Sequence, residues 1–301
     1  MKKLIISIAA IAAASCGLHA QIFWKVSGGN ATGDSYIFGT HHLAPVSMVD
    51  SVAGFRNALA SVSAIAGEID FTEMQNPAVM QAVSAHYTAP ADSMLTMVLT
   101  QPQTDSLNSV LASYTGGMLN AGQIAPMKPA MVSTQLALFV AMEAMGPEAA
   151  QALASGQQLD SYIQQMAASE GKSLIGFESI DRQMTLLMDD PIAEQADALM
   201  KTVAQIMAGT AQTASRELTQ AYLNQDLAEI ERLILDDENF TPESHARLIT
   251  DRNADWTRQL SEILPDRTVL VAVGVGHLPG AEGLIELLRK EGYTVEPVTG
   301  K

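Results

Sequence analysis

Short runs of β-branched and aromatic residues lie near both ends of the chain, and helical periodicity dominates between them. The runs at 23–26 (FWKV) and 35–38 (SYIF) flank a segment rich in Gly, Asn and Asp, which predicts a β-hairpin. Further strands are predicted at 63–70, 173–177, 268–273 and 294–298. The run at 268–273 (TVLVAV) is apolar on both faces, which indicates a strand at the centre of a sheet.

Apolar residues recur at spacings of three and four over much of the remaining chain. Met48, Val52, Phe55 and Leu59 follow this pattern and predict a helix over 48–59. The same pattern predicts helices over 192–206, 223–234 and 284–289, and residues 75–170 are mostly helical in character. The chain is therefore expected to form one α/β domain, in which a mixed central sheet carries a large helical insertion or cap at roughly 75–170 and 190–262.

The first twenty residues have the pattern of an export signal. Lys2 and Lys3 precede an apolar run over 4–14 that is too short to span a bilayer, and Ala20 offers a small residue at the cleavage position. A secretory signal peptide is therefore predicted at 1–20, with the mature domain at 21–301. Alternatively, a weak lipobox ending at Cys16 would give a lipoprotein anchored to a membrane. Either route predicts a periplasmic or extracellular protein.

Charge and cysteine content narrow the classes of partner and site. The 33 acidic residues exceed the 17 basic ones, and a net charge of −16 repels phosphate backbones, so nucleic acid is not an expected partner. Cys16 is the single cysteine, which excludes an internal disulfide framework, an iron–sulfur cluster and cysteine-based zinc sites. Chemistry is therefore expected from histidines and carboxylates.

Two strands run directly into the same short motif. Gly39-Thr40-His41-His42 follows the strand at 35–38, and Gly274-Val275-Gly276-His277 follows the central strand. Glycine lets the chain turn without a Cβ in the way, so the histidine three residues later can face a crevice beyond the strand ends. Ligands of open α/β sheets bind in such crevices.

Carboxylates follow two other strands in the same manner. Glu68 and Asp70 come at the end of the strand at 63–70, and Glu178 follows the strand at 173–177. Histidines and carboxylates that converge at strand ends predict a divalent-metal site, where the metal would activate water and polarise a carbonyl. An additional glutamate suits a general base, and Arg252 suits an oxyanion or a substrate carboxylate.

Each of these residues also has a purely structural interpretation. A histidine at a strand end can be solvated, and Asp70 or Glu68 can cap the following helix. Glu178 can complement the dipole of the helix that it precedes, and Arg252, which is expected to follow an amphipathic helix, can form an ordinary surface ion pair.

Several segments together resemble the TraB/GumN family, over about residues 23–298. They are YIFGTHH, AIAGEID, GFESIDRQM, RNADW and VAVGVGHLPGAEGLIELLRKEGYTVEPV, while residues 80–170 match only in helical character. That family is related to the TIKI metalloproteases and, more distantly, to erythromycin-esterase-like and ChaN-like proteins. The resemblance implies a fold of the erythromycin-esterase/ChaN-like kind.

The resemblance also implies roles for individual residues. Metal ligands would be His42, His277 and Glu68, with manganese or cobalt as the implied metal and zinc as a further candidate. Glu178 would be the base or a fourth ligand, and Arg252 would orient the substrate. Supporting positions are Gly39, Asp70, Gln183, Asn253, Gly274 and His41, the last of which stands where other members often carry Met or Ile.

The expected function is a secreted or periplasmic metal-dependent hydrolase that cleaves a peptide or a similar amide or ester in a peptide or small-molecule substrate. The resemblance to the TIKI-like members implies action on peptide bonds. Two alternatives stay open. The same crevice could bind a peptide or haem without catalysis, as the ChaN-like relatives suggest. The GumN label suggests an accessory factor in exopolysaccharide production.

Overall fold

A computed structural model describes residues 21–42, 44–145, 158–236 and 241–299. The expectations for the leader at 1–20, including cleavage after Ala20 and lipidation of Cys16, lie outside these residues. The core is a six-stranded mixed sheet in the order β4-β3-β5-β2-β1-β6. Its strands are β1 (Phe23–Gly28), β2 (Ser35–Thr40), β3 (Ala64–Gly67), β4 (Ser173–Gly176), β5 (Val269–Gly274) and β6 (Tyr293–Pro297). The predicted α/β class with a mixed sheet is confirmed.

Parallel pairing brings four strand ends to one edge of the sheet. β3 pairs in parallel with β4 and with β5, and β5 pairs in parallel with β2. β1 runs antiparallel to β2, so the predicted hairpin is confirmed, with Phe23 opposite Phe38. β5 lies in the interior of the sheet and is buried along its length up to Gly274, as its apolar pattern predicts. The carboxyl ends of β2, β3, β4 and β5 therefore meet at the same edge.

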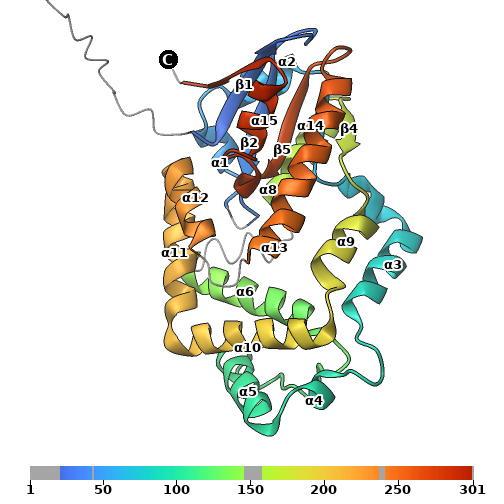
Figure 1. Ribbon diagram of the computed structural model, residues 1–301, viewed down its shortest axis with the longest axis vertical. Helices are drawn as coiled ribbons and strands as arrows, with labels where there is room; N and C mark the ends of the chain where they lie inside the picture. Colours follow the sequence, from blue (N-terminus) through green and yellow to red (C-terminus); the bar gives the residue numbers. More distant parts are fainter. Residues whose placement is uncertain (1–20, 43, 146–157, 237–240, 300–301) are drawn as a thin grey trace, which may run out of the picture.

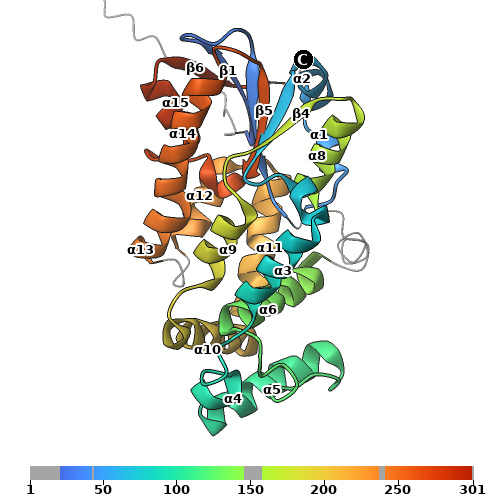
Figure 2. The same ribbon diagram turned by 90° about the vertical axis from the view of Figure 1, so that its right-hand side faces the viewer.

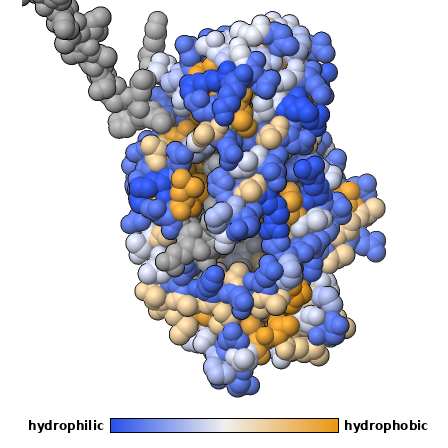
Figure 3. Space-filling model, viewed as in Figure 1, coloured by the Kyte–Doolittle hydropathy of each residue, from blue (hydrophilic) through white to orange (hydrophobic). Residues whose placement is uncertain are grey.

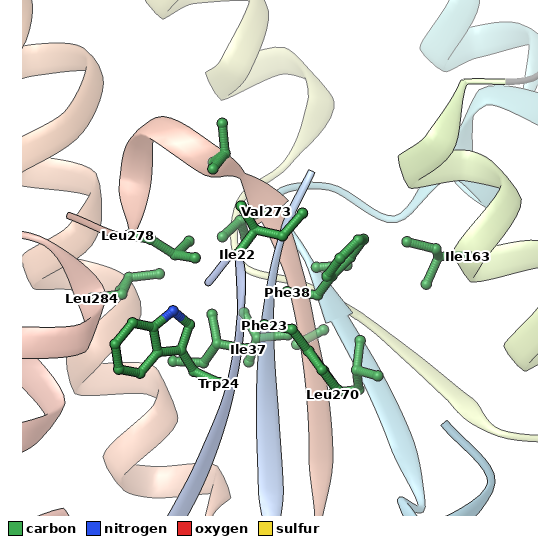
Figure 4. Packing of buried hydrophobic residues seen from close by; sticks show 14 of the residues in the cluster. Ile22, Phe23, Trp24, Ile37, Phe38, Ile163, Leu270, Val273, Leu278 and Leu284 are labelled. Carbon is green, nitrogen blue, oxygen red and sulfur yellow. The ribbon is translucent and has the colours of Figure 1, made fainter. Parts of the chain in front are cut away.

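Helices cover both faces of this sheet (Figures 1 and 2). α14 (Asp251–Ile263) and α15 (Leu284–Lys290) lie on one face, and α1 (Met48–Ser51), α2 (Phe55–Ser61) and α8 (Leu159–Ser169) lie on the other. Successive side chains of β1 and β2 point alternately toward the helices on one face of the sheet and toward those on the other. Phe23 and Phe38 lie toward Ile163 of α8, whereas Trp24 and Ile37 lie toward Leu284 of α15 (Figure 4).

A second hydrophobic core forms among helices distant from the sheet (Figure 1). It is built by α4 (Leu95–Val98), α5 (Gln101–Thr115), α6 (Pro129–Met145) and α10 (Ile192–Ala208), with α11 (Thr210–Leu223) packed against α6 and α10. Leu199, Val203 and Ile206 of α10 belong to the periodic stripe that predicts this helix, and all three are buried there. The surface over these helices mixes apolar and polar side chains (Figure 3). Within the described residues, no helix is both long and apolar enough to cross a membrane.

Shorter helices connect the two halves of the protein, which are the sheet with its covering helices and the separate helical core. α3 (Pro77–Tyr87) packs against α9 (Ile180–Met188) around Val83 and Ile180. α12 (Leu227–Leu235) follows α11, and α13 (Pro242–His245) continues through a π-helical turn at Ala246–Thr250 into α14. Two 3-10 turns lie at Phe71–Gln75 and Val275–His277.

Two predicted helices are each divided by a break that the apolar spacing does not reveal. The predicted helix over 48–59 is α1 and α2, because Gly54 between them has a left-handed φ of 80°. In the predicted helix over 223–234, Leu223 ends α11 and Leu227 begins α12. The chain changes direction there through Gln225 (φ 56°), and Asp226 caps the amino end of α12.

Candidate functional site

The two Gly-x-x-His motifs begin side by side on neighbouring parallel strands. Thr40 at the end of β2 is the register partner of Gly274 at the end of β5. β3, which ends before Glu68, lies on the other side of β5, and β4 lies beyond it. The residues after β3 and β4 are joined by a hydrogen bond from the amide of Glu178 to the carbonyl of Glu68 at 3.0 Å. The strand-end edge therefore gathers the predicted histidines and glutamates from segments that are far apart in the sequence.

Neighbouring segments approach both motif glycines so closely that a side chain at either position would be crowded. A Cβ on Gly39 would lie 2.9 Å from Val275 Cγ2, so the first motif can pack against the second only with glycine there. A Cβ on Gly274 would lie 3.2 Å from Glu68 Oε1, the oxygen that accepts the Gly274 amide at 2.9 Å. Neither glycine has a positive φ, so the need is space and not a left-handed turn.

Arg252 stands at the centre of the site, buried between two carboxylates. Its Nη2 donates to Glu68 Oε2 at 2.6 Å and also to Glu178 Oε1, and its Nε donates to the same Glu178 oxygen at 3.1 Å. Nη1 donates to the Leu248 carbonyl at 3.0 Å and to His277 Nε2 at 3.2 Å. All five N–H groups of this guanidinium are thus engaged within the protein.

Arg252 and Asn253 follow the amphipathic helix α12 in the chain, and they lie in the first turn of α14. The helix continues from α13 without interruption, because the π-helical turn carries the chain into α14. Trp256, one turn later, packs against the Arg252 guanidinium and the His277 ring. The Arg252 Cζ lies 4.6 Å from the Trp256 ring centroid, and the Trp256 and His277 ring centroids are 4.4 Å apart.

The pKa values of the two glutamates are shifted in opposite directions. Burial opposes ionisation of Glu68, but its electrostatic interactions with His277, Arg252 and His42 outweigh it and lower the Glu68 pKa to about 2. Burial raises the pKa of Glu178 despite its bonds to Arg252. Glu178 Oε2 is buried without a hydrogen-bond partner among the described residues, although Arg182 Nε lies 3.7 Å away. Gln183 Nε2 donates to Glu68 Oε2 at 2.9 Å and to Glu178 Oε1 at 3.4 Å.

His277 is buried and held in one orientation by Asn253. The Asn253 Nδ2 group donates to the carbonyls of His277 and Glu282 at 3.1 and 2.8 Å, so its Oδ1 accepts from His277 Nδ1 at 2.7 Å. The hydrogen-bond pattern thereby assigns the proton to Nδ1 and the lone pair to Nε2. Burial lowers the His277 pKa to about 4, which leaves the ring neutral at neutral pH.

His42 has an equivalent support that the sequence did not reveal. Its Nδ1 lies 2.8 Å from Asp160 Oδ2, while Asp160 Oδ1 accepts from the Thr40 hydroxyl. Desolvation opposes the charged imidazole, but the bond and charge of Asp160 outweigh it and raise the His42 pKa to about 9. The His42 side chain is 59 % exposed, in contrast to the buried Asp160, so it is open to a substrate.

Asp160 is the main site residue that sequence reasoning missed. It lies in the first turn of α8, where an acidic residue is ordinarily explained by the helix dipole. Its burial is the distinguishing signal, and burial is a property of the tertiary structure. Tyr222 was missed for the same reason: its hydroxyl donates to the Gly39 carbonyl at 2.9 Å, beneath the first motif.

Two of the predicted supporting residues do not join the central cluster. Asp70 caps the 3-10 turn at 71–75, where its Oδ1 accepts from the Thr72 amide at 2.9 Å and from the Thr72 hydroxyl at 2.7 Å. His41 packs against Tyr222, with 5.3 Å between ring centroids, and burial lowers its pKa to about 4. The sequence interpretation of Asp70 as a cap agrees with these contacts.

The site contains the donor types, imidazole and carboxylate, that bind divalent metals in proteins. Each motif histidine has its Nδ1 bound to a side-chain oxygen, the arrangement that orients Nε2 toward a metal. Glu68 Oε1 lies 3.9 Å from His277 Nε2, which provides a mixed nitrogen and oxygen pair. As the side chains stand, no group of three or more His, Cys, Asp or Glu in the described part of the chain is placed to hold an ion, and Arg252 donates to His277 Nε2.

Comparison with known proteins gives a match at the level of the family. The model of the TraB/PrgY/gumN family matches residues 22–297, which include the whole sheet and every site residue described above. No curated protein and no solved structure matches the chain.

Proposed function

Given that the chain belongs to the TraB/PrgY/gumN family, we propose that it is a metal-dependent hydrolase that cleaves peptide bonds outside the cytoplasm. The observation that carries this proposal is the matched support of the two motif histidines. Asp160 holds His42 and Asn253 holds His277, each at Nδ1, so that Nε2 of each ring remains for a ligand, which at His42 would displace a proton. Export is supported by the leader pattern at residues 1–20.

His42, His277 and Glu68 would hold the metal. Manganese and cobalt are the implied ions, and zinc also prefers such a mixed nitrogen and oxygen set. When bound, the metal supplies an activated water and polarises the scissile carbonyl.

Arg252 organises the site more than it binds the substrate. Its side chain is 8 % exposed and all of its donors are engaged, so it fixes the positions of Glu68 and Glu178 relative to His277.

Glu178 is best placed to position Arg252. Its side chain is 1 % exposed, and its Oε1 is occupied by the guanidinium. Direct proton transfer to a substrate would require a carboxylate that the substrate can reach. We therefore assign Glu178 to holding the guanidinium.

Metal analysis of purified protein tests this proposal. The wild type and the His42→Ala, His277→Ala and His86→Ala variants would be loaded separately with Mn²⁺, Co²⁺ or Zn²⁺, desalted and assayed for bound metal. His86 is the matched control, because it pairs with Asp181 and Asp189 away from the sheet edge. Wild type and the His86 variant should retain the ion, and the motif variants should lose it. Equal retention in all four proteins would contradict the metal site.

Cleavage is tested separately with a peptide library before and after chelation. Cleavage that chelation removes and added metal restores supports the hydrolase. Metal retention without any cleavage would favour the non-catalytic peptide binder instead. A Soret band on addition of haem, lost in His42→Ala, would favour the haem-binding alternative.

A further inference from the structure

A cavity of about 270 Å³ opens beside the second histidine motif, and its walls combine apolar and acidic groups. It lies between α12, the π-helical turn before α14 and the loop that carries His277. The loop contributes Gly276 and residues 279–283. Typical cavities for whole small ligands measure roughly 300–1,000 Å³, so this space suits a single side chain of a larger substrate.

The cavity borders the loop that carries His277 of the proposed reaction centre. Gly276, in its wall, directly precedes His277 in the chain. One amide group of Asn253 donates to the carbonyl of His277 and to that of Glu282, which lines the cavity. The loop that holds the reactive imidazole and the loop that forms the cavity are therefore fixed by the same side chain.

Backbone without side chains forms one wall of the cavity. A Cβ on Gly276 would lie 3.1 Å from Ile234 Cδ1, and one on Gly280 would lie 3.0 Å from Glu231 Oε1. Gly280 also has a left-handed φ of 84°, which disfavours any other residue. Larger residues at either position would fill the space between the loop and α12.

The other walls of the cavity contain both apolar side chains and carboxylates. Ile234, Ile249 and Pro279 are the apolar residues that argue for an aliphatic chain. Glu231 and Glu282 supply the charge; Glu282 Oε2 accepts from the Thr250 hydroxyl at 2.9 Å. Among the described residues, neither glutamate forms a salt bridge. His245 lines the cavity as well.

We infer that this cavity receives the basic side chain, lysine or arginine, of the peptide substrate. A basic side chain has an aliphatic stem for the apolar walls and a terminal cation for Glu231 and Glu282. The net charge of −16 favours the approach of such a peptide. This inference rests on the proposed function, because it names the substrate class of the same centre.

Matched peptides test the inference. Capped fluorogenic peptides would differ at one position only, which is scanned through lysine, arginine, norleucine and glutamate. The metal-loaded wild type should cleave the lysine and arginine peptides with kcat/KM about tenfold above norleucine. Equal rates for lysine and norleucine would overturn the inference and leave the hydrolase proposal intact.

Variants of the two cavity glutamates test whether the preference for a basic side chain arises in this cavity. Glu231→Gln and Glu282→Gln should each lower kcat/KM for the lysine peptide by a larger factor than for the norleucine peptide. Glu229→Gln is the control, because that carboxylate lies on the same helix and pairs with Arg232 outside the cavity. A parallel loss for lysine and norleucine in the Glu231 variant, with its melting temperature preserved, would overturn the assignment.

Binding distinguishes this inference from the proposed function if no peptide is cleaved. Affinities of the uncleaved lysine and norleucine peptides for the wild type and Glu231→Gln would be measured by calorimetry. Tighter binding of the lysine peptide that depends on Glu231 supports the cavity as a basic-side-chain site, whatever the outcome for cleavage. Binding that ignores both the side chain and the variant overturns it.

Discussion

Arg252 shows how one residue can organise a site while remaining inaccessible. Its guanidinium joins Glu68, Glu178 and His277, and it packs on Trp256. Planar geometry and five donors allow this, and the compact ammonium of lysine has neither. A buried cation of this kind is held in place by its partners, and they in turn depend on it.

Replacing Arg252 with leucine should therefore destabilise the fold strongly. Glu68 and Glu178 would be left buried without a compensating charge, which costs about 3–5 kcal/mol when one partner of a buried pair is removed. Urea denaturation would measure the free energy of unfolding. Arg258→Leu is the control: it lies on the same helix with its side chain 62 % exposed, so little change is expected. Similar losses for the two variants would show that the buried network is not what stabilises this region.

At the scale of elements, α3 and α9 are joined by a chain of charged groups away from the sheet edge. His86 of α3 lies between two acids, 3.1 Å from Asp181 Oδ1 and 2.8 Å from Asp189 Oδ2. Lys128, directly before α6, also donates to Asp189. These contacts connect α3, α9 and the start of α6, where the two halves of the protein meet.

The link at Asp189 predicts a pH dependence of stability. Burial opposes ionisation, but Lys128 and His86 outweigh it and lower the pKa of Asp189 below its reference value of 3.8. A lowered pKa in the folded state means that the stabilisation is fully present above about pH 3.8 and is lost as the pH falls through the folded-state value. Asp189→Asn should thus cost about 1 kcal/mol at pH 7 and progressively less in acid.

Urea denaturation of wild type and Asp189→Asn between pH 7 and pH 3 would measure this difference. Asp105→Asn, on an exposed face of α5, provides the comparison, since its carboxylate accepts only from Gln101 among the described residues. A difference for Asp189→Asn that stays constant over the whole range would contradict the linkage argument.

At the scale of the whole molecule, a bound metal should raise thermal stability. The proposed ligands follow β2, β3 and β5, so an ion would link segments that are distant in the sequence, and binding to the folded state alone shifts the equilibrium toward it. At a metal concentration of 100 times Kd the gain is about 2.7 kcal/mol. Calorimetry with and without Mn²⁺ would measure it. The increase should be absent in His277→Ala and present in His86→Ala, and an equal increase in both would show binding elsewhere.

Most of the central cluster could be predicted from the motifs that the chain shares with its family. Glu68, Glu178, Gln183, Arg252 and His277 all lie in contact, as those motifs imply. Asp70 is also acidic and comes two residues after Glu68 in the same run, yet it caps a turn. Local sequence does not distinguish Asp70 from Glu68, because which face of the strand end a side chain takes depends on the segment packed against it.

What the sequence determined by itself is what short-range periodicity encodes: the six strands, the hairpin, the central place of β5, and the two motifs that follow β2 and β5. The tertiary structure decided the contacts between distant segments. Asp160 reaches His42 across 118 residues, and Tyr222 reaches Gly39 across 183. Such contacts depend on how helices pack on the sheet, and hydrophobic spacing identifies the buried face of a helix without identifying its partner. For this reason the sequence identified the motif residues of the site, while the side chains that orient them, such as Asp160, are defined only by the fold.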